Sequence, residues 1–221
     1  MKKIKVIVLA FFACSALSAQ TYLSYGTASS SGGGGGSIVS KLANTTDGVV
    51  GSVYLFPTWN NMATVSAVGD KEFQINNLNF NALESTFVSQ LSKDTIFTFS
   101  GIEKVKVNNK LFVNVNDKFF ESLAENSKGE RLLKEYVVKY TKPTVHVITN
   151  VVTGPAEYKN FENYYMRSAD GSLNEIKLNK KEFLKFFGDD SKLVESYAKS
   201  HKLKFGNEED VIQILKYYYH Q

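Results

Sequence analysis

The residues that could carry chemistry in this chain are three histidines, one cysteine and a few neighbouring carboxylates. His146, His201 and His220 lack the spacing of a zinc site such as H-E-x-x-H. Ser-His-Asp hydrolysis would need a serine on a sharp turn, and the chain contains no G-x-S-x-G. The acidic runs Asp189-Asp190 and Glu208-Glu209-Asp210 stand where helices are expected to begin, so capping accounts for them. The sequence therefore predicts no catalytic residue, no metal site and no cofactor.

One short stretch, LFPTWNN at residues 55–61, is a candidate ligand-binding loop. Trp59 is the only tryptophan of the chain, and it stands beside Pro57 and two asparagines that favour a turn. An exposed Trp59, with Phe56 beside it, could stack on a sugar ring or dock in a pocket of a partner protein. The alternative is that Phe56 and Trp59 close one end of the hydrophobic core.

The first 19 residues have the pattern of a secretory signal peptide. Three lysines precede an apolar run over residues 6–13, and small residues lead to Ala19. As a helix the apolar run would reach roughly 12 Å, far less than the ~30 Å hydrocarbon core of a bilayer. We expect cleavage between Ala19 and Gln20, and export to the periplasm or the extracellular medium.

The single cysteine, Cys14, offers a second interpretation, a lipoprotein anchor. The residues before it are Phe11-Phe12-Ala13, and two bulky aromatics stand where a lipoprotein motif has an aliphatic and a small residue. Ordinary cleavage is therefore favoured. It removes Cys14 and leaves a mature chain without thiol or disulfide chemistry.

The charge balance bears on possible partners. The chain of 221 residues carries a formal charge of +4, and three of the lysines belong to the signal peptide. The mature protein is thus close to neutral overall, which gives no reason to expect binding to nucleic acid or to an anionic membrane. Only Arg131 and Arg167 could make bidentate phosphate contacts. No other segment approaches the ~18 apolar residues of a membrane-spanning helix.

The remaining chain divides by composition and by hydrophobic period. Residues 20–50 contain a Gly/Ser-rich run typical of a flexible segment, and this run lacks the spacing of a phosphate-binding loop. Residues 51–178 alternate with period two, with runs at 132–140, 145–152 and 164–167, and Asn108-Asn109 has the composition of a hairpin turn. Together with the C-terminal segment they predict one domain, 51–221.

Residues 179–221 change to a helical period. Asn179 with Glu182 forms a capping-box pattern at the start of the first helix. Gly206-Asn207 precedes the third helix, whose first turn is acidic. Two to three short helices are expected to bury a shared set of apolar side chains against the sheet: Phe183, Leu184, Phe187, Leu193, Tyr197, Val211, Leu215 and Tyr218. The predicted fold is α+β and mostly β, an antiparallel meander forming a sandwich or partly open barrel with these helices packed on it.

Ordered blocks of the chain resemble a known group of proteins. The blocks GDKEFQINNLNFNALES, KLFVNV, FFESL, RLLKEY and LKFGNEEDVIQILKYYYHQ are similar to an uncharacterised family of signal-peptide-bearing secreted proteins of flavobacterium-like Bacteroidota. The resemblance covers residues 51–221 and implies no activity and no site residue. Asp94-Thr95-Ile96 also resembles the O-glycan acceptor of exported proteins of that phylum, which would make Thr95 a modification site.

The sequence thus favours an exported, non-catalytic module. It would bind an unknown protein or cell-envelope component through a sheet face or the Trp59 loop. The alternative is a secreted or periplasmic hydrolase whose site is assembled only in three dimensions.

Overall fold

A computed structural model describes residues 36–39, 49–69, 71–92 and 95–220. The predicted signal peptide, Cys14 and the cleavage site lie outside these residues. Two short strands, β1 (Gly36–Val39) and β2 (Val49–Val50), fall within the segment 20–50. The rest of that segment lies outside the described part of the chain.

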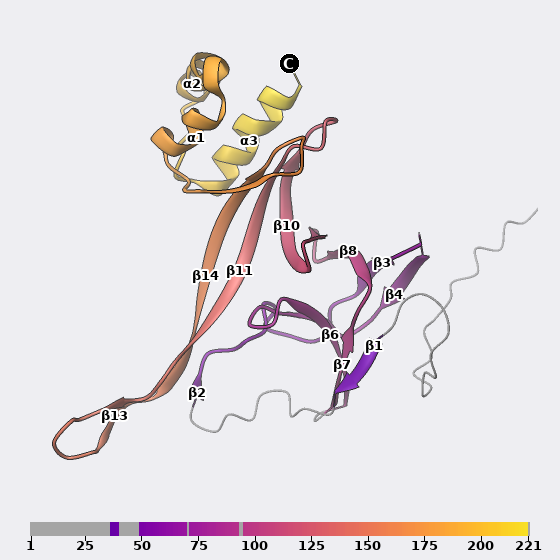
Figure 1. Ribbon diagram of the computed structural model, residues 1–221, viewed down its shortest axis with the longest axis vertical. Coiled ribbons are helices and arrows are strands. Elements are labelled where there is room, and N and C mark those ends of the chain that lie inside the picture. Colours follow the sequence, from indigo (N-terminus) through magenta and orange to yellow (C-terminus); the bar gives the residue numbers. More distant parts are fainter. Residues whose placement is uncertain (1–35, 40–48, 70, 93–94, 221) are drawn as a thin grey trace, which may run out of the picture.

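The molecule is elongated, with two β-sheets in the middle, three helices at one end and a long two-stranded arm that reaches the other end (Figure 1). The smaller sheet has the order β1, β7 (Thr95–Phe99), β6 (Thr86–Ser92) and β5 (Leu78–Asn81). The larger sheet has the order β15 (Leu173–Ile176), β14 (Ala156–Arg167), β11 (Arg131–Thr141), β10 (Lys118–Glu125), β9 (Lys110–Val115), β8 (Ile102–Val107), β3 (Ala63–Ala67) and β4 (Lys71–Ile75). The fold is mostly β, as predicted.

Most of the larger sheet is an antiparallel meander, in which strands that follow one another in the chain lie side by side. Asn108 and Asn109 have φ values of 49° and 62° and join β8 to β9 in a two-residue hairpin. Asn116 and Asp117, at 53° and 62°, join β9 to β10 in the same way. Positive φ at both central positions matches the twist of the flanking strands, and Asn and Asp tolerate it better than most residues. The predicted turn at Asn108-Asn109 is confirmed.

The two sheets share a core of aromatic rings. Phe80 and Phe87 of the smaller sheet meet Phe112 and Phe119 of the larger sheet, and all four are buried. The ring centroid of Phe87 lies 5.0 Å from that of Phe80, 5.3 Å from that of Phe112 and 4.9 Å from that of Phe119. Edge-on contacts at these distances add to the gain from burial. The sheets are therefore packed face to face here, and neither closes on itself.

The helices α1 (Lys180–Phe186), α2 (Ser191–Ser200) and α3 (Glu208–Tyr219) pack on the end of the larger sheet (Figure 1). Asn179 and Asn207 cap α1 and α3, since each side-chain oxygen accepts a backbone N–H three residues on. The shared core joins helical residues such as Phe183 and Leu215 to Leu132 and Met166 of the sheet. The prediction that the helices pack on the sheet is confirmed.

Two local expectations need correction. Leu193 was expected to face inward, and it is 40% exposed. Helix α2 instead buries Val194 and Ala198, four residues apart and therefore on one face. Strand β14 begins at Ala156, eight residues before the predicted run at 164–167. Its first half, AEYKNFEN, has too few apolar residues to show period two.

Candidate functional site

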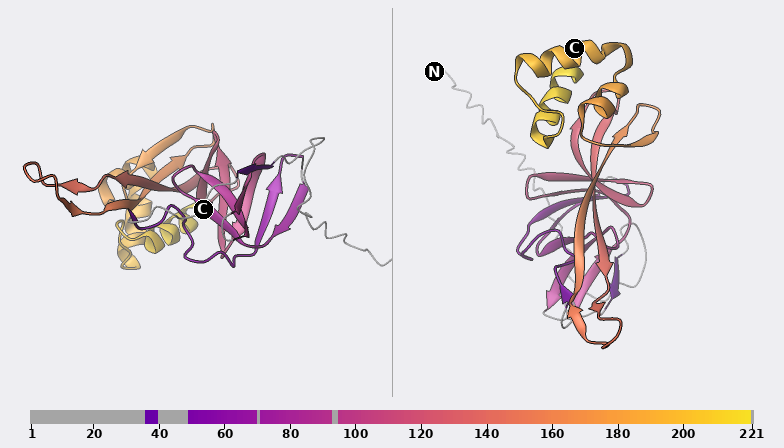
Figure 2. Two further views of the ribbon diagram at one scale, coloured as in Figure 1. Left: turned by 90° about the horizontal axis from the view of Figure 1, so that it is seen from below. Right: turned by 90° about the vertical axis from the view of Figure 1, so that its left-hand side faces the viewer.

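The most distinctive feature of the molecule is the arm that β11 and β14 form. The two strands pair without a break from Arg131↔Arg167 to Thr141↔Glu157. Strand β10 pairs with β11 only as far as Lys134, so the outer half of β11 extends beyond the meander. Figure 2 shows the arm running from the helices past the sheets to its tip. Strand β2 pairs in parallel with the outer end of β14, at Ala156 and Glu157, so the part of the arm that projects from the body is the segment beyond these residues.

We define the tip as residues 141–155, which form a small hairpin of β12 (Thr144–Val145) and β13 (Val152–Gly154). The backbone N–H of His146 donates to the carbonyl of Val151 at 2.9 Å, and the N–H of Asn150 donates to that of His146 at 2.9 Å. Every residue from 141 to 153 is exposed. The hairpin is therefore closed by its own hydrogen bonds and not by packing against the body.

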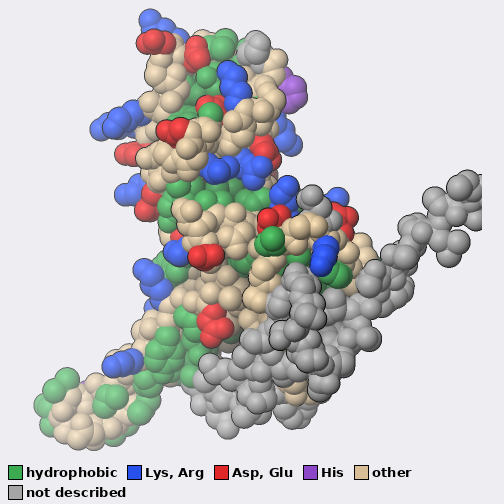
Figure 3. All heavy atoms as spheres, turned by 45° about the vertical axis from the view of Figure 1, so that its right-hand side comes forward, with side chains coloured by type: hydrophobic (Ala, Val, Ile, Leu, Met, Phe, Trp, Pro, Cys, Tyr) green, Lys and Arg blue, Asp and Glu red, His purple; other side chains and the backbone are tan. Residues whose placement is uncertain are grey.

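Exposed aliphatic side chains gather in the tip, among threonines and other polar residues. Val147 is 92% exposed and Ile148 is 87% exposed, and three further valines are also exposed: Val145, Val151 and Val152. In the space-filling view, green apolar side chains lie on the knob at the end of the arm, with tan polar side chains and backbone between them (Figure 3). Scattered exposed apolar residues are normal on protein surfaces, whereas contiguous apolar patches on a projecting element mark contact sites.

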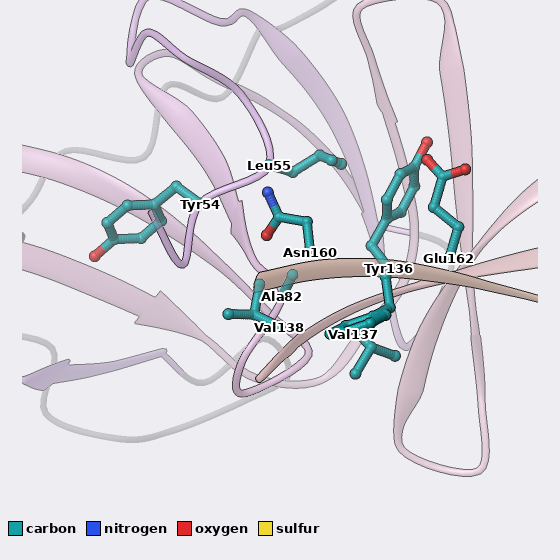
Figure 4. A pocket seen from close by; sticks show the side chains of 9 residues that line it. Tyr54, Leu55, Ala82, Tyr136, Val137, Val138, Asn160 and Glu162 are labelled. Carbon is teal, nitrogen blue, oxygen red and sulfur yellow. The ribbon is translucent and has the colours of Figure 1, made fainter. Parts of the chain in front are cut away.

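A pocket lies where the arm leaves the body. Its volume is about 240 Å³, and the arm contributes Tyr136, Val138, Asn160 and Glu162 among its lining residues. Tyr136 and Glu162 lie beside one another on one side and Tyr54 lies on the other (Figure 4). Ligand pockets usually measure roughly 300–1,000 Å³, so this one is small.

Beside the pocket, buried charges tie the arm to the helical end. The Nζ of Lys134, a buried residue of β11, lies 3.0 Å from Glu162 of β14 and 2.9 Å from Glu208 of α3. The Tyr164 hydroxyl donates to the same Glu208 carboxylate at 2.7 Å. A buried lysine is costly unless it is paired, and two carboxylates pair with this one.

The pKa values of this cluster follow from burial and pairing. Desolvation alone would lower the pKa of Lys134 and raise that of Glu208. The contacts with Glu208 and Glu162 outweigh desolvation and raise the pKa of Lys134. The hydrogen bonds from Tyr164 and Lys134 likewise outweigh desolvation and lower the pKa of Glu208. Burial, followed by the hydrogen bond to Glu208, raises the pKa of Tyr164. These pKa shifts favour the cation of Lys134, the anion of Glu208 and the neutral hydroxyl of Tyr164, which are the forms that bond to one another.

A second ion pair adjoins the first. Lys110 donates to both oxygens of the buried Glu121 at 2.9 Å. The Tyr136 hydroxyl also donates to Glu121, at 2.5 Å. Burial, and then the hydrogen bond to Glu121, raises the pKa of Tyr136. The Glu121 carboxylate is thus neutralised and hydrogen-bonded within the protein.

The opposite face of the arm has a similar cluster. Glu135 accepts hydrogen bonds from Lys118 at 2.9 Å and from Tyr165 at 2.9 Å. Burial, followed by the hydrogen bond to Glu135, raises the pKa of Tyr165 to about 12. We call residues 134–136 of β11 the root of the arm. On both faces of the root, charged groups are paired across neighbouring strands, as is typical of a structural network. In the described part of the chain, no group of three or more His, Cys, Asp or Glu residues is placed to hold a metal ion.

The residues singled out from the sequence lie elsewhere. Phe56 is buried in the core between the sheets, and its backbone N–H donates to the Asn79 side chain at 3.0 Å. Trp59 is half-buried, with its ring edge-on to Tyr54 at 4.7 Å. Thr95 begins β7 and is half-buried, while its neighbour Asp94 lies outside the described residues. The structure does not bring Thr95 to the pocket or to the tip.

The histidines are also dispersed. His146 lies in the tip, where its Nδ1 is 3.1 Å from the Thr149 hydroxyl. His201 follows α2, and His220 follows α3 at the far end of the molecule. His146 was expected to lie within a strand, and it lies instead in the loop between β12 and β13. It is exposed, as expected.

The tip is not evident as a site from the sequence, because residues 145–152 have the pattern of one more strand. A usable signal was present: no Asp or Glu occurs between Glu135 and Glu157, and this stretch is rich in Val. A connection that faces water usually carries more acidic and other polar residues than this one.

Comparisons of the chain with protein families, with curated proteins and with solved structures found no match. The fold is that of a β-rich protein with a projecting arm and three helices packed at one end. None of the described helices is both long and apolar enough to cross a membrane.

Proposed function

We propose that this protein is an exported, non-catalytic binding module that contacts a protein or cell-envelope component through the tip of the β11–β14 arm. The proposal rests on the exposure of Val147 and Ile148 at the end of an 11-residue strand pairing. These side chains stabilise nothing in the described structure. Their exposure has a free-energy cost in water that contact with an apolar partner would remove.

The root of the arm supports the same role. Lys134 and Glu208 join the arm to α3. On the two faces of the arm, the Tyr136 hydroxyl bonds to Glu121 and Glu135 bonds to Lys118 of the meander. Such cross-strand and helix contacts stiffen the root, and a stiff root holds the tip in place. A pre-positioned contact element loses less conformational freedom on binding than a mobile loop.

A site-specific photocrosslinking experiment tests the proposal. A photoreactive residue replaces Val147 in one protein and Val68, which is 56% exposed on the β3–β4 turn, in the control. Both proteins are exposed to cell-envelope extract and irradiated. We expect adducts with protein or lipid at position 147 and not at position 68. Equal labelling at the two positions would refute a specific role for the tip.

A double substitution, Val147→Asp with Ile148→Asp, complements this experiment. Both side chains are exposed, so the free energy of unfolding should change by less than about 0.5 kcal/mol. Retention of the protein on envelope material should nevertheless fall. Unchanged retention by a folded double variant would count against the proposal.

A further inference from the structure

We infer that the tip docks shallowly on a lipid bilayer that carries anionic phospholipid. This inference rests on the proposed function and names the partner of that same surface. It follows from the arrangement of three kinds of side chain along the arm: aliphatic at the apex, tyrosine behind them, and lysine around both.

The apex has the composition of a surface that enters hydrocarbon. Five exposed aliphatic side chains, all Val or Ile, are interspersed there with His146, Thr149 and Asn150. The tip contains no Asp, Glu or Arg, and its single lysine is Lys142. Protein interfaces concentrate their binding energy in Trp, Tyr and Arg, and Val is under-represented among such residues. The tip has none of those three types. Its chemistry therefore favours lipid over a groove in a partner protein.

Two tyrosines lie at the base of the tip, where Tyr158 also packs against the core between the sheets. Tyr140 and Tyr158 are cross-strand partners with ring centroids 5.6 Å apart, and Tyr140 is 49% exposed. Tyrosine concentrates at the boundary between hydrocarbon and headgroups, because its ring is apolar and its hydroxyl can stay hydrated. The pair therefore marks the level on the arm that would match the bilayer interface.

Lysines surround this level. Lys139 and Lys159 occupy directly opposed positions on the two strands, and Lys142 follows them toward the tip. Like charges directly opposite one another destabilise a strand pair. One of these lysines is paired, since the Glu157 carboxylate lies 3.4 Å from the Lys159 Nζ. An anionic surface would relieve this repulsion, so the local charge of the arm differs from the near-neutral balance of the whole protein.

The length of the tip limits how far it can enter. Residues 144–147 extend at most ~13 Å, because a strand advances about 3.3 Å per residue, whereas the hydrocarbon core is about 30 Å thick. The tip therefore reaches into one leaflet and does not cross. The unpaired outer edges of β12 and β13 would be costly deep in hydrocarbon, so they hold the contact at the interfacial depth.

A second copy of the chain is a less suitable occupant. The pocket at the base of the arm measures about 240 Å³. That is below the range typical even for small ligands, so it cannot receive five aliphatic side chains of another tip.

Vesicle flotation of the full chain tests the inference. Vesicles of phosphatidylcholine alone are compared with vesicles of equal parts phosphatidylcholine and phosphatidylglycerol. We expect the protein to float with the mixed vesicles, and Val147→Asp with Ile148→Asp to weaken this partition at least about tenfold. The matched control, Val68→Asp with Leu83→Asp, adds two charges at exposed apolar positions elsewhere and should bind as the wild type does.

A charge variant separates the two contributions. Replacing Lys139, Lys142 and Lys159 with Gln should weaken binding to the mixed vesicles by about fivefold for each lysine at low salt. The preference for phosphatidylglycerol should then be lost. The same change at three other exposed lysines, Lys71, Lys104 and Lys106, is the control and should leave the preference in place.

The possible outcomes are distinguishable. If the wild type does not float with either kind of vesicle, or if the tip variant floats equally well, the lipid inference is wrong. If position 147 nevertheless crosslinks to a protein, or if the tip variant abolishes self-association in sedimentation, the tip is a protein contact and the proposed function stands. If the tip variants match the wild type in every one of these assays, both proposals fail.

Discussion

Replacing Phe183 with Ala tests whether the helices and the sheets form one cooperative unit. Phe183 of α1 is fully buried, and its ring lies 5.2 Å from that of Phe187 and 5.8 Å from that of Phe205. It belongs to the cluster that also contains Leu132 and Met166 of the larger sheet. A Phe→Ala change in such a core costs about 3–5 kcal/mol, a large part of the ~5–15 kcal/mol that stabilises a whole domain.

The assay follows urea unfolding with two probes. Helical circular dichroism reports on α1 to α3, while Trp59, the only tryptophan, reports on the segment that packs against the smaller sheet. With a slope of about 2.5 kcal/mol per molar urea, the midpoint should fall by about 1–2 M. If the fold is one unit, both probes should shift together.

A matched substitution provides the control. Leu193→Ala removes an aliphatic side chain from α2 that is 40% exposed, so its midpoint should shift by less than about 0.5 M. A Phe183→Ala protein in which the helical signal melts early and the Trp59 signal keeps its wild-type midpoint would refute the reasoning. The helices would then be a separate module.

Three further predictions concern acid stability, a buried amide and export. Because the pKa of Glu208 is lowered in the folded state, its stabilising contribution is complete above the unfolded-state pKa of about 4.3 and is lost as pH falls through the folded value. Lys134→Met should therefore flatten the acid limb of a stability-against-pH curve measured by urea unfolding, and an unchanged limb would contradict the pairing. Asn79→Ala leaves the backbone N–H and carbonyl of Phe56 without their partners and should cost about 2–4 kcal/mol by thermal or urea unfolding, whereas a loss below about 0.5 kcal/mol would contradict it. Mass spectrometry of the exported protein should show Gln20 as its first residue, and an acylated Cys14 would show a lipoprotein instead.

Much of the fold follows from local rules that can be read along the chain. Asn108-Asn109 is a turn because both positions need positive φ, and Asn179 caps α1 because its side chain reaches the N–H of Glu182. These interactions join residues a few positions apart. Their geometry is therefore fixed by the residues themselves, whatever the rest of the protein does.

The candidate site did not follow from the sequence in the same way. Lys134 and Glu208 are 74 positions apart, and nothing near either residue indicates that they pair. The first half of β14 shows no clear alternation, so its pairing with β11 depends on the neighbouring strand and not on its own pattern. Cross-strand partners of this kind are set by register over the whole ribbon.

The amino-acid pattern alone indicates a protein built mainly of strands with a helical end, because side-chain period and turn residues act locally. Only the tertiary structure decided which apolar residues are covered. Val105 and Val147 each have another valine two positions away, Val107 and Val145, yet Val105 is fully buried and Val147 is 92% exposed. Burial depends on whether another segment reaches the same face, which is a property of the whole chain. The structure leaves residues 141–153 exposed at the end of the arm, and so makes them available for contact.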